Sequence, residues 1–135
     1  MSELEIYIDG ASKGNPGPSG IGVVICRNTE TIKNISSYIG TATNNVAEYS
    51  ALIYALQEAL VLGGQKIKIH TDSQLLYRQL KKIYKVKNPN ILRLYQQATR
   101  LISAFQEVSL NNISRQHNRG ADKLANLAVK KAGRK

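Results

Sequence analysis

Hydrophobic and polar residues alternate near the start of the chain, where Leu4, Ile6 and Ile8 are separated by Glu5 and Tyr7. Alternation with a period of two residues predicts a half-buried β-strand. Similar apolar segments predict four more strands, over residues 21–27, 31–39, 66–71 and 108–113. Because short turn-rich segments join the first three strands, we expect these three to form an antiparallel meander.

Apolar residues recur at helical spacing in the remaining segments. These segments predict helices over residues 43–62, 73–82, 91–105 and 120–132. The order strand, long helix, strand requires a crossover and favours parallel pairing of the first and fourth strands. The pattern therefore predicts an α/β fold with a mixed five-stranded sheet, three strands antiparallel and two parallel, flanked by helices. A length of 135 residues fits a single domain over residues 1–135.

The chain has three aspartates, Asp9, Asp72 and Asp122, and each lies at the predicted boundary of a strand or helix. Parallel pairing would bring Asp9 and Asp72 together at the carboxyl ends of two strands, where open α/β sheets bind ligands. Each aspartate also has a purely structural explanation. Asp9 could be a turn residue, Asp72 a helix N-cap, and Asp122 an acid favoured by the helix dipole.

Glu48 is a fourth candidate, because it continues the helical stripe of Leu52, Ala55 and Ala59 and so should face the sheet. Taken alone, Glu48 is better explained as part of a capping box with Asn45. Four carboxylates in one corner would repel one another unless divalent cations neutralised them. Oxygen ligands suit Mg²⁺ or Mn²⁺, and two such ions can promote phosphodiester hydrolysis.

Basic residues are in large excess, and the net charge is +10. Between residues 73 and 106 the sequence has no acid and the basic residues Arg78, Lys81, Lys82, Lys85, Lys87, Arg93 and Arg100. A field of one sign attracts polyanions such as nucleic acids. The alternative is a basic face that only improves solubility.

Several classes of protein are excluded by composition. No apolar run approaches the roughly 18 residues of a membrane span, so we expect no membrane association. Residues 1–5 show no secretory signal, and a cytoplasmic location is the default expectation. A single cysteine, Cys26, can form neither an intramolecular disulfide nor a multi-cysteine zinc site.

Four segments resemble the type 1 ribonuclease H family in order and spacing. They are residues 8–18 (IDGASKGNPGP), 43–48 (TNNVAE), 71–74 (TDSQ) and 121–125 (ADKLA). The resemblance runs through nearly the whole chain. It implies the ribonuclease H-like fold and endonucleolytic hydrolysis of the RNA strand of RNA/DNA hybrids. The products would carry a 5′-phosphate and a 3′-hydroxyl.

The resemblance also implies roles for individual residues. Asp9, Glu48, Asp72 and Asp122 match the catalytic metal ligands, with two Mg²⁺ expected beside substrate and Mn²⁺ as an alternative. The matching substrate-contact positions are Gly10, Ser12, Asn15, Thr43, Asn44, Asn45, Ser73 and Gln74. Amides both donate and accept hydrogen bonds, which suits a ribose 2′-hydroxyl. Turn and cap chemistry explains several of the same residues without a ligand.

The sequence departs from the family at two places. Only residues 83–90 stand where many members have a long basic protrusion with tryptophans, and this chain has no Trp. His117 lies five positions before Asp122, in a shorter loop than usual. The resemblance implies an auxiliary role for His117 in proton transfer or product release, whereas a surface loop histidine is the alternative.

Other functions remain open at this point. A related exonuclease would carry an acid at the position of Ala11, so Ala11 argues against that class. The alternative that stays open is a catalytically weak or silent RNA/DNA hybrid-binding protein of the same fold, although a silent one should lack at least one of the four acids and all four are present. Some shortened relatives are thought to cleave double-stranded RNA, so this substrate is a further alternative. We expect a monomer.

Overall fold

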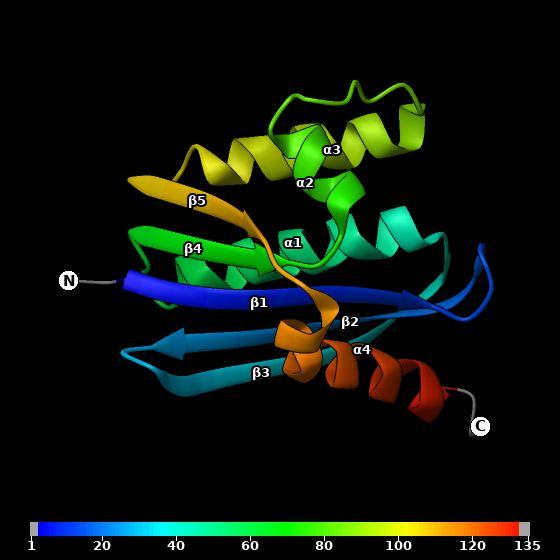
Figure 1. The fold of residues 1–135 in the computed structure, drawn as a ribbon, viewed down its shortest axis with the longest axis horizontal. Coiled ribbons are helices and arrows are strands. Elements are labelled where there is room, and N and C mark those ends of the chain that lie inside the picture. The colour runs from blue at the N-terminus through cyan, green and yellow to red at the C-terminus, as the bar shows by residue number, and fades with distance from the viewer. Residues whose placement is uncertain (1–2, 133–135) are drawn as a thin grey trace.

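The five strands form one sheet in the order β3-β2-β1-β4-β5, with helices on both of its faces (Figure 1). The structure is a computed structural model that describes residues 3–132. The strands are β1 (Glu3–Ser12), β2 (Gly17–Arg27), β3 (Glu30–Ala42), β4 (Lys66–Thr71) and β5 (Glu107–Asn112). The helices are α1 (Asn44–Val61), α2 (Gln74–Leu80), α3 (Pro89–Ile102), α4 (Arg119–Ala132) and the short 3₁₀ helix η1 (Arg115–Asn118).

The strand pairing confirms the predicted mixed sheet. β1 pairs with β2, and β2 with β3, in antiparallel register. β1 pairs with β4, and β4 with β5, in parallel register. The parallel pairing of β1 and β4 ends at Ile8 opposite Thr71, so the residues that follow these two positions emerge side by side.

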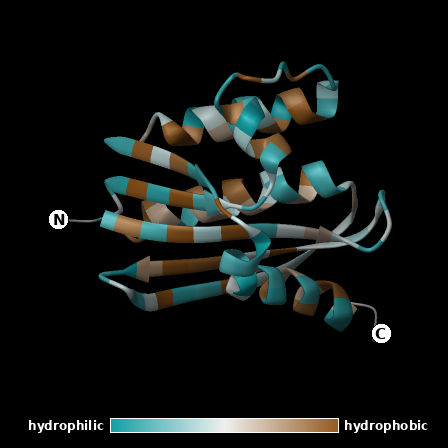
Figure 2. Cartoon of the chain, in the orientation of Figure 1, coloured by the Kyte–Doolittle hydropathy of each residue, from teal (hydrophilic) through white to brown (hydrophobic). Residues whose placement is uncertain are grey.

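The two faces of the sheet are covered by different helices (Figure 1). Leu4, Ile6 and Ile8 of β1 are fully buried against α1, which in turn packs on α3. Along β1 and β4, hydrophobic and polar residues alternate (Figure 2). One side of these strands therefore forms the core, and the other stays polar.

Helix α4 lies on the opposite face, over β2 and the end of β1. Its backbone approaches so closely that a Cβ atom at Gly22 would lie 2.0 Å from the carbonyl oxygen of Ala121. Gly22 is paired with Asp9 across the β1–β2 ladder. The glycine therefore lets the first turn of α4 settle next to Asp9.

The boundaries of several elements differ from those predicted. β1 does not end at Asp9 but continues to Ser12, because residues 9–12 pair with 19–22 of β2. The explanation of Asp9 as a turn residue is therefore wrong. β3 extends from Glu30 to Ala42 rather than from 31 to 39, and α3 begins at Pro89, capped by the Asn88 side chain. η1 was not predicted, since one short turn leaves no periodic signal.

Among residues 3–132, no helix is both long enough and apolar enough to cross a lipid bilayer.

Candidate active site

Three carboxylates meet where β1 and β4 stop pairing. Asp9 comes from β1, Glu48 from the first turns of α1, and Asp72 directly follows β4. Each offers an oxygen, and these three oxygens lie within 4.8 Å of one another. The predicted proximity of Asp9 and Asp72 is thus confirmed, and its cause is the parallel register.

Glu48 is fixed by a hydrogen bond to the backbone of β1. Its Oε1 accepts from the Gly10 amide at 2.8 Å. The N-cap of α1 is Thr43, whose hydroxyl accepts from the Val46 amide at 3.2 Å. The capping-box explanation of Glu48 is therefore wrong, because the N-cap is Thr43, two residues before Asn45, and it is satisfied without Glu48.

Gly10 permits this contact between helix and strand. A Cβ atom at position 10 would lie 2.4 Å from the backbone carbon of Ala47, far inside van der Waals contact. Any side chain here would push α1 away from β1 and pull Glu48 away from Asp9. The glycine is thus a condition for the carboxylate cluster.

Asp72 is held from the opposite side by Asn118 of η1. The Asn118 amide nitrogen donates to Asp72 Oδ2 at 3.1 Å and to the Ile8 carbonyl at 2.8 Å. Asn118 is 1% exposed, so its hydrogen bond to Ile8 is buried, whereas the one to Asp72 is partly buried. Ser73, not Asp72, caps α2, and the N-cap explanation of Asp72 is wrong.

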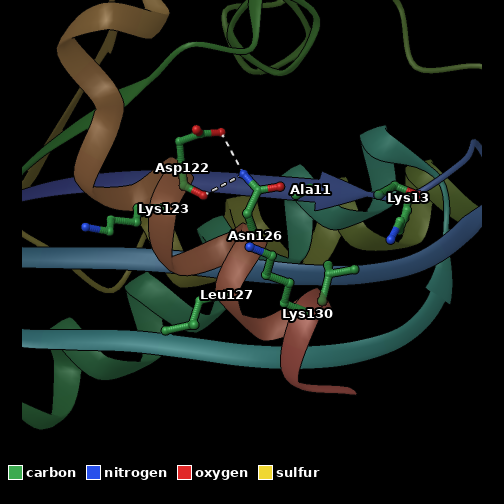
Figure 3. Close-up of a pocket in the computed structure, with 9 residues that line it drawn as sticks. Ala11, Lys13, Asp122, Lys123, Asn126, Leu127 and Lys130 are labelled. Carbon is green, nitrogen blue, oxygen red and sulfur yellow. Dashed lines mark hydrogen bonds between the residues drawn. The ribbon is translucent and has the colours of Figure 1, made fainter. Parts of the chain in front are cut away.

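Asp122 lies in the first turn of α4 and completes the acidic lining of the same cavity, whose volume is about 490 Å³. The Asn126 amide, one turn later, donates to Asp122 Oδ1 at 3.2 Å and to its carbonyl oxygen at 2.9 Å (Figure 3). The Arg115 guanidinium is 3.8 Å from the same Oδ1. The Asp122 side chain is 31% exposed, far more than Asp9 or Glu48.

The crowding of carboxylates has an electrostatic cost. Burial, and then the charges of Glu48 and Asp72, raise the pKa of Asp9 to about 9. Burial and the charge of Asp72 raise the pKa of Glu48 to about 8, although the Gly10 amide and Arg115 act in the opposite direction. Two carboxyls that resist ionisation at neutral pH are characteristic of a functional site.

This set of donors fits a hard divalent cation. Carboxylate oxygens from three separate elements converge on one point, and Asp122 lines the same cavity. A bound cation would relieve the repulsion that raises both pKa values. Asp9, Glu48 and Asp72 are therefore the residues that could hold a metal ion, and Asp122 lines the same cavity beside them.

The polar residues expected to touch substrate fall into two groups. Gly10, Ser12, Asn44 and Ser73 line the acidic cavity. The other four, which are Asn15, Thr43, Asn45 and Gln74, lie outside its lining.

Two of the polar residues outside the cavity have evident structural contacts. Thr43 caps α1, and Asn15 Oδ1 accepts from the Asn44 amide at 2.9 Å, which ties the β1–β2 turn to the start of α1. Asn45 differs, because within residues 3–132 its buried Oδ1 has no hydrogen-bond partner. A buried acceptor without a partner is uncommon in a folded protein and marks Asn45 as a residue whose polar contact is incomplete.

His117 is not brought into the acidic cavity. It lies with Tyr7 and Val24 around a separate hollow of about 220 Å³. Its ring Nδ1 is 2.6 Å from the Ser114 hydroxyl. Within η1, Arg115 is the residue that lines the acidic cavity.

Sequence reasoning missed three residues of this site: Arg115, Asn118 and Asn126. Asn126 could have been found, since it is four residues after Asp122 on the same helix and such pairs face each other. Arg115 was counted only as one basic residue among many. No local signal identifies Asn118, because its partners Ile8 and Asp72 are 110 and 46 residues away.

The sequence is similar to a known protein family and to proteins of other organisms. A family model described as "Reverse transcriptase-like" matches residues 7–128. The Bifunctional protein Rv2228c of Mycobacterium tuberculosis is 40% identical over 129 residues. That match covers 94% of this chain but 35% of the relative, so the chain spans about a third of that protein's length.

Two solved structures are similar over nearly their whole length. The crystal structure of RNase H1 from the archaeon Halobacterium salinarum has a TM-score of 0.94 and 37% identity, covering 96% of this chain and 99% of that one. LC11-RNase H1 in complex with RNA/DNA hybrid has a TM-score of 0.91 and 38% identity, with 96% and 98% covered.

Proposed function

This chain belongs to the type 1 ribonuclease H family, and on that basis we propose that it is an endonuclease that hydrolyses the RNA strand of RNA/DNA hybrids. The products carry a 5′-phosphate and a 3′-hydroxyl. The observation that carries the proposal is the convergence of the Asp9, Glu48 and Asp72 oxygens within 4.8 Å on a chain with a net charge of +10. Acids concentrated at one point of a basic protein suit a polyanion cleaved beside bound cations.

Asp9, Glu48, Asp72 and Asp122 would hold two Mg²⁺ ions, or Mn²⁺ in their place. When bound, divalent cations activate a water molecule and stabilise the leaving oxygen of a phosphodiester. The chain keeps the carboxylates in position for this: the Gly10 amide orients Glu48, and the Asn118 amide orients Asp72. Such partners behind metal ligands fix their geometry and tune their affinity.

Arg115 supplies positive charge at the open side of the cavity. Its guanidinium is 3.8 Å from Asp122 and opposes the rise in the pKa of Glu48. Because this side chain is 82% exposed, it can turn toward an incoming phosphate. We propose that Arg115, rather than His117, assists the negatively charged transition state in this chain.

Recognition of the hybrid rests on the polar residues at the start of α1 and α2. The Asn45 side chain, whose buried Oδ1 has no partner, would turn outward to accept a hydrogen bond from a ribose 2′-hydroxyl, the group that distinguishes RNA from DNA. Asn44 and Ser73 line the acidic cavity together with Gly10 and Ser12, and Gln74 directly follows Ser73. LC11-RNase H1, a relative, has been solved with an RNA/DNA hybrid, which supports hybrid as the substrate. Asn15 and Thr43 are proposed to receive a phosphate of the DNA strand.

The test is cleavage of end-labelled RNA/DNA hybrid, double-stranded RNA and double-stranded DNA with Mg²⁺ or Mn²⁺, beside Asp9→Asn. We expect internal cuts in the RNA of the hybrid and at least about a thousandfold loss in the variant, as for an interaction made in the transition state. Cutting of double-stranded RNA would add a second substrate. No cleavage by the wild type with either metal, combined with tight hybrid binding, would identify a silent hybrid-binding protein instead.

A further inference from the structure

A second cavity of about 590 Å³ lies between the end of β1 and the outer side of α4 (Figure 3). We call it the α4 groove, and its lining is Ala11, Ser12, Lys13, Asp122, Lys123, Asn126, Leu127, Val129 and Lys130. None of the roles proposed above uses its basic residues. Its volume falls in the range of sites that bind small molecules or segments of larger ligands.

The α4 groove continues directly from the acidic cavity. The two cavities share Ala11, Ser12, Asp122 and Asn126 as lining residues. Asn126 lies at the junction, because it is hydrogen-bonded to Asp122 on one side and lines the groove on the other. A chain-like ligand with one phosphate at the acids could therefore extend into the groove without leaving the surface.

The charge changes sign between the two cavities. The acidic cavity is lined by four carboxylates and Arg115, whereas the α4 groove has Lys13, Lys123 and Lys130 around the single shared acid, Asp122. All three lysines are exposed and free to reach a ligand. Leu127 and Val129 give the groove an apolar wall between the cations. Phosphates fit the lysines, and sugar or base surfaces fit the apolar wall.

We propose that the α4 groove binds the RNA strand beyond the cleaved phosphodiester, with Lys123 and Lys130 contacting its phosphates. This inference rests on the proposed function. The occupant is the cleaved strand rather than the DNA strand, because the groove is continuous with the carboxylates that act on that strand. The groove would supply some of the contacts to nucleic acid that a long basic protrusion makes possible in other members and that the short segment of residues 83–90 cannot make.

The test compares two double variants with the same change in net charge. Lys123→Gln/Lys130→Gln removes the proposed contacts, whereas Lys66→Gln/Lys68→Gln removes two lysines at the amino end of β4, away from Asp72. Hybrid cleavage is measured over a series of salt concentrations. We expect the groove variant to raise KM about tenfold with kcat little changed, and to lower the salt slope of binding by about one per lysine. The control should retain wild-type values.

A second measurement identifies the strand. The substrate is a duplex in which one strand carries a short run of ribonucleotides, so that cleavage is confined to that run. In separate substrates, a neutral methylphosphonate linkage replaces one phosphate next to the run, either on the strand that contains it or on the opposite DNA strand. A neutral linkage on the RNA-containing strand should weaken binding by the wild type. It should not weaken binding by the groove variant any further, because the linkage and the lysine substitutions remove the same contact. The DNA strand should show no such coupling.

The outcomes separate this inference from the function on which it rests. If the wild type cleaves hybrid and the two double variants behave alike, the groove proposal is wrong and the function stands. Coupling to linkages on the DNA strand alone would also overturn it, since the groove would then hold the other strand. If the wild type cleaves nothing, the proposed function fails first, and the groove proposal fails with it.

Discussion

The two halves of the acidic centre are built in opposite ways. Asp9 and Glu48 are 5% and 9% exposed and are attached to the β1–α1 contact. Asp122 and its neighbour Arg115 are 31% and 82% exposed and belong to α4 and η1. The buried half fixes positions through backbone packing, at the cost of raised pKa values. The open half keeps charge where a polyanion can reach it, and its geometry depends on side chains.

The strongest challenge to the buried half is Gly10→Ala. Because the added Cβ would lie 2.4 Å from the Ala47 backbone carbon, β1 and α1 must separate. We expect a loss of about 3 kcal/mol in unfolding free energy, at the upper end of the usual range for overpacking. Denaturant unfolding measures it. At Gly120 the nearest contact would be an ordinary 3.4 Å, so Gly120→Ala is the matched control. Equal effects of the two substitutions would contradict the role of Gly10.

Asp9→Asn tests the electrostatic cost of ionising the carboxyl groups in the buried half. Asp9 binds its proton more tightly when folded, with a pKa of about 9 against 3.8. The folded state therefore holds more protons between these values, and stability falls as the pH rises through this range. Glu48, with a pKa raised from 4.5 to about 8, adds to the same trend.

In chelator, we therefore expect Asp9→Asn to raise the unfolding free energy by about 3 kcal/mol near pH 8 and by less near pH 5. Addition of Mg²⁺ or Mn²⁺ should stabilise the wild type near pH 8 more than the variant, because a bound ion replaces the protons. Thermal unfolding at both pH values, with Glu30→Gln as the surface control, gives the measurement. A metal-free wild type that grows more stable toward pH 8 would contradict the raised pKa values.

Asn118→Ala tests the link between the halves. It removes the buried donor shared by the Ile8 carbonyl and Asp72 Oδ2, so we expect a loss of about 2 kcal/mol in stability. The apparent Mg²⁺ affinity should fall about tenfold, because residues that hydrogen-bond to a metal ligand hold that ligand in its binding orientation. Denaturant unfolding measures the loss of stability, and isothermal titration calorimetry with Mg²⁺ measures the loss of metal affinity. Asn90→Ala, at an exposed position, should change neither. An unchanged metal affinity would restrict Asn118 to a purely structural role.

Arg115→Gln tests the open half. Because the side chain is mostly solvent-exposed, we expect little change in stability and about a tenfold loss in kcat/KM, near 1.4 kcal/mol. Initial rates on hybrid give this value. Arg119→Gln removes a neighbouring exposed charge outside the cavity lining and is the control. If both variants lose activity equally, Arg115 acts only through the overall field.

His117→Ala should have the smallest effect. The ring lies beside Tyr7 and Ser114, outside the acidic cavity. We expect the change in kcat/KM to correspond to less than about 0.5 kcal/mol of free energy, which is the range of ordinary surface substitutions. Rates across the neutral pH range give the comparison with wild type. A large loss of activity in this variant would restore the auxiliary role implied by the family resemblance.

Much of the fold was predictable, because the signals that define it are local. Alternation at Leu4, Ile6 and Ile8 predicted β1, and the crossover order predicted its parallel pairing with β4. The extension of β1 to Ser12 was not predictable, because the segment is rich in turn residues and is held extended by β2. The cap at Thr43 was missed in favour of Asn45 for a similar reason: both residues are acceptable caps.

The sequence by itself determined which residues are acidic, where they stand relative to strand ends, and hence that Asp9 and Asp72 would meet. Only the tertiary structure decided how Glu48 and Asp72 are held, which η1 side chain faces the acids, and that a basic groove continues from them. Residue type and spacing encode contacts within a helix, strand or ladder. Asn118, Arg115 and the α4 groove depend on how α4 settles on β2 at Gly22, a packing contact between distant segments that no local pattern records.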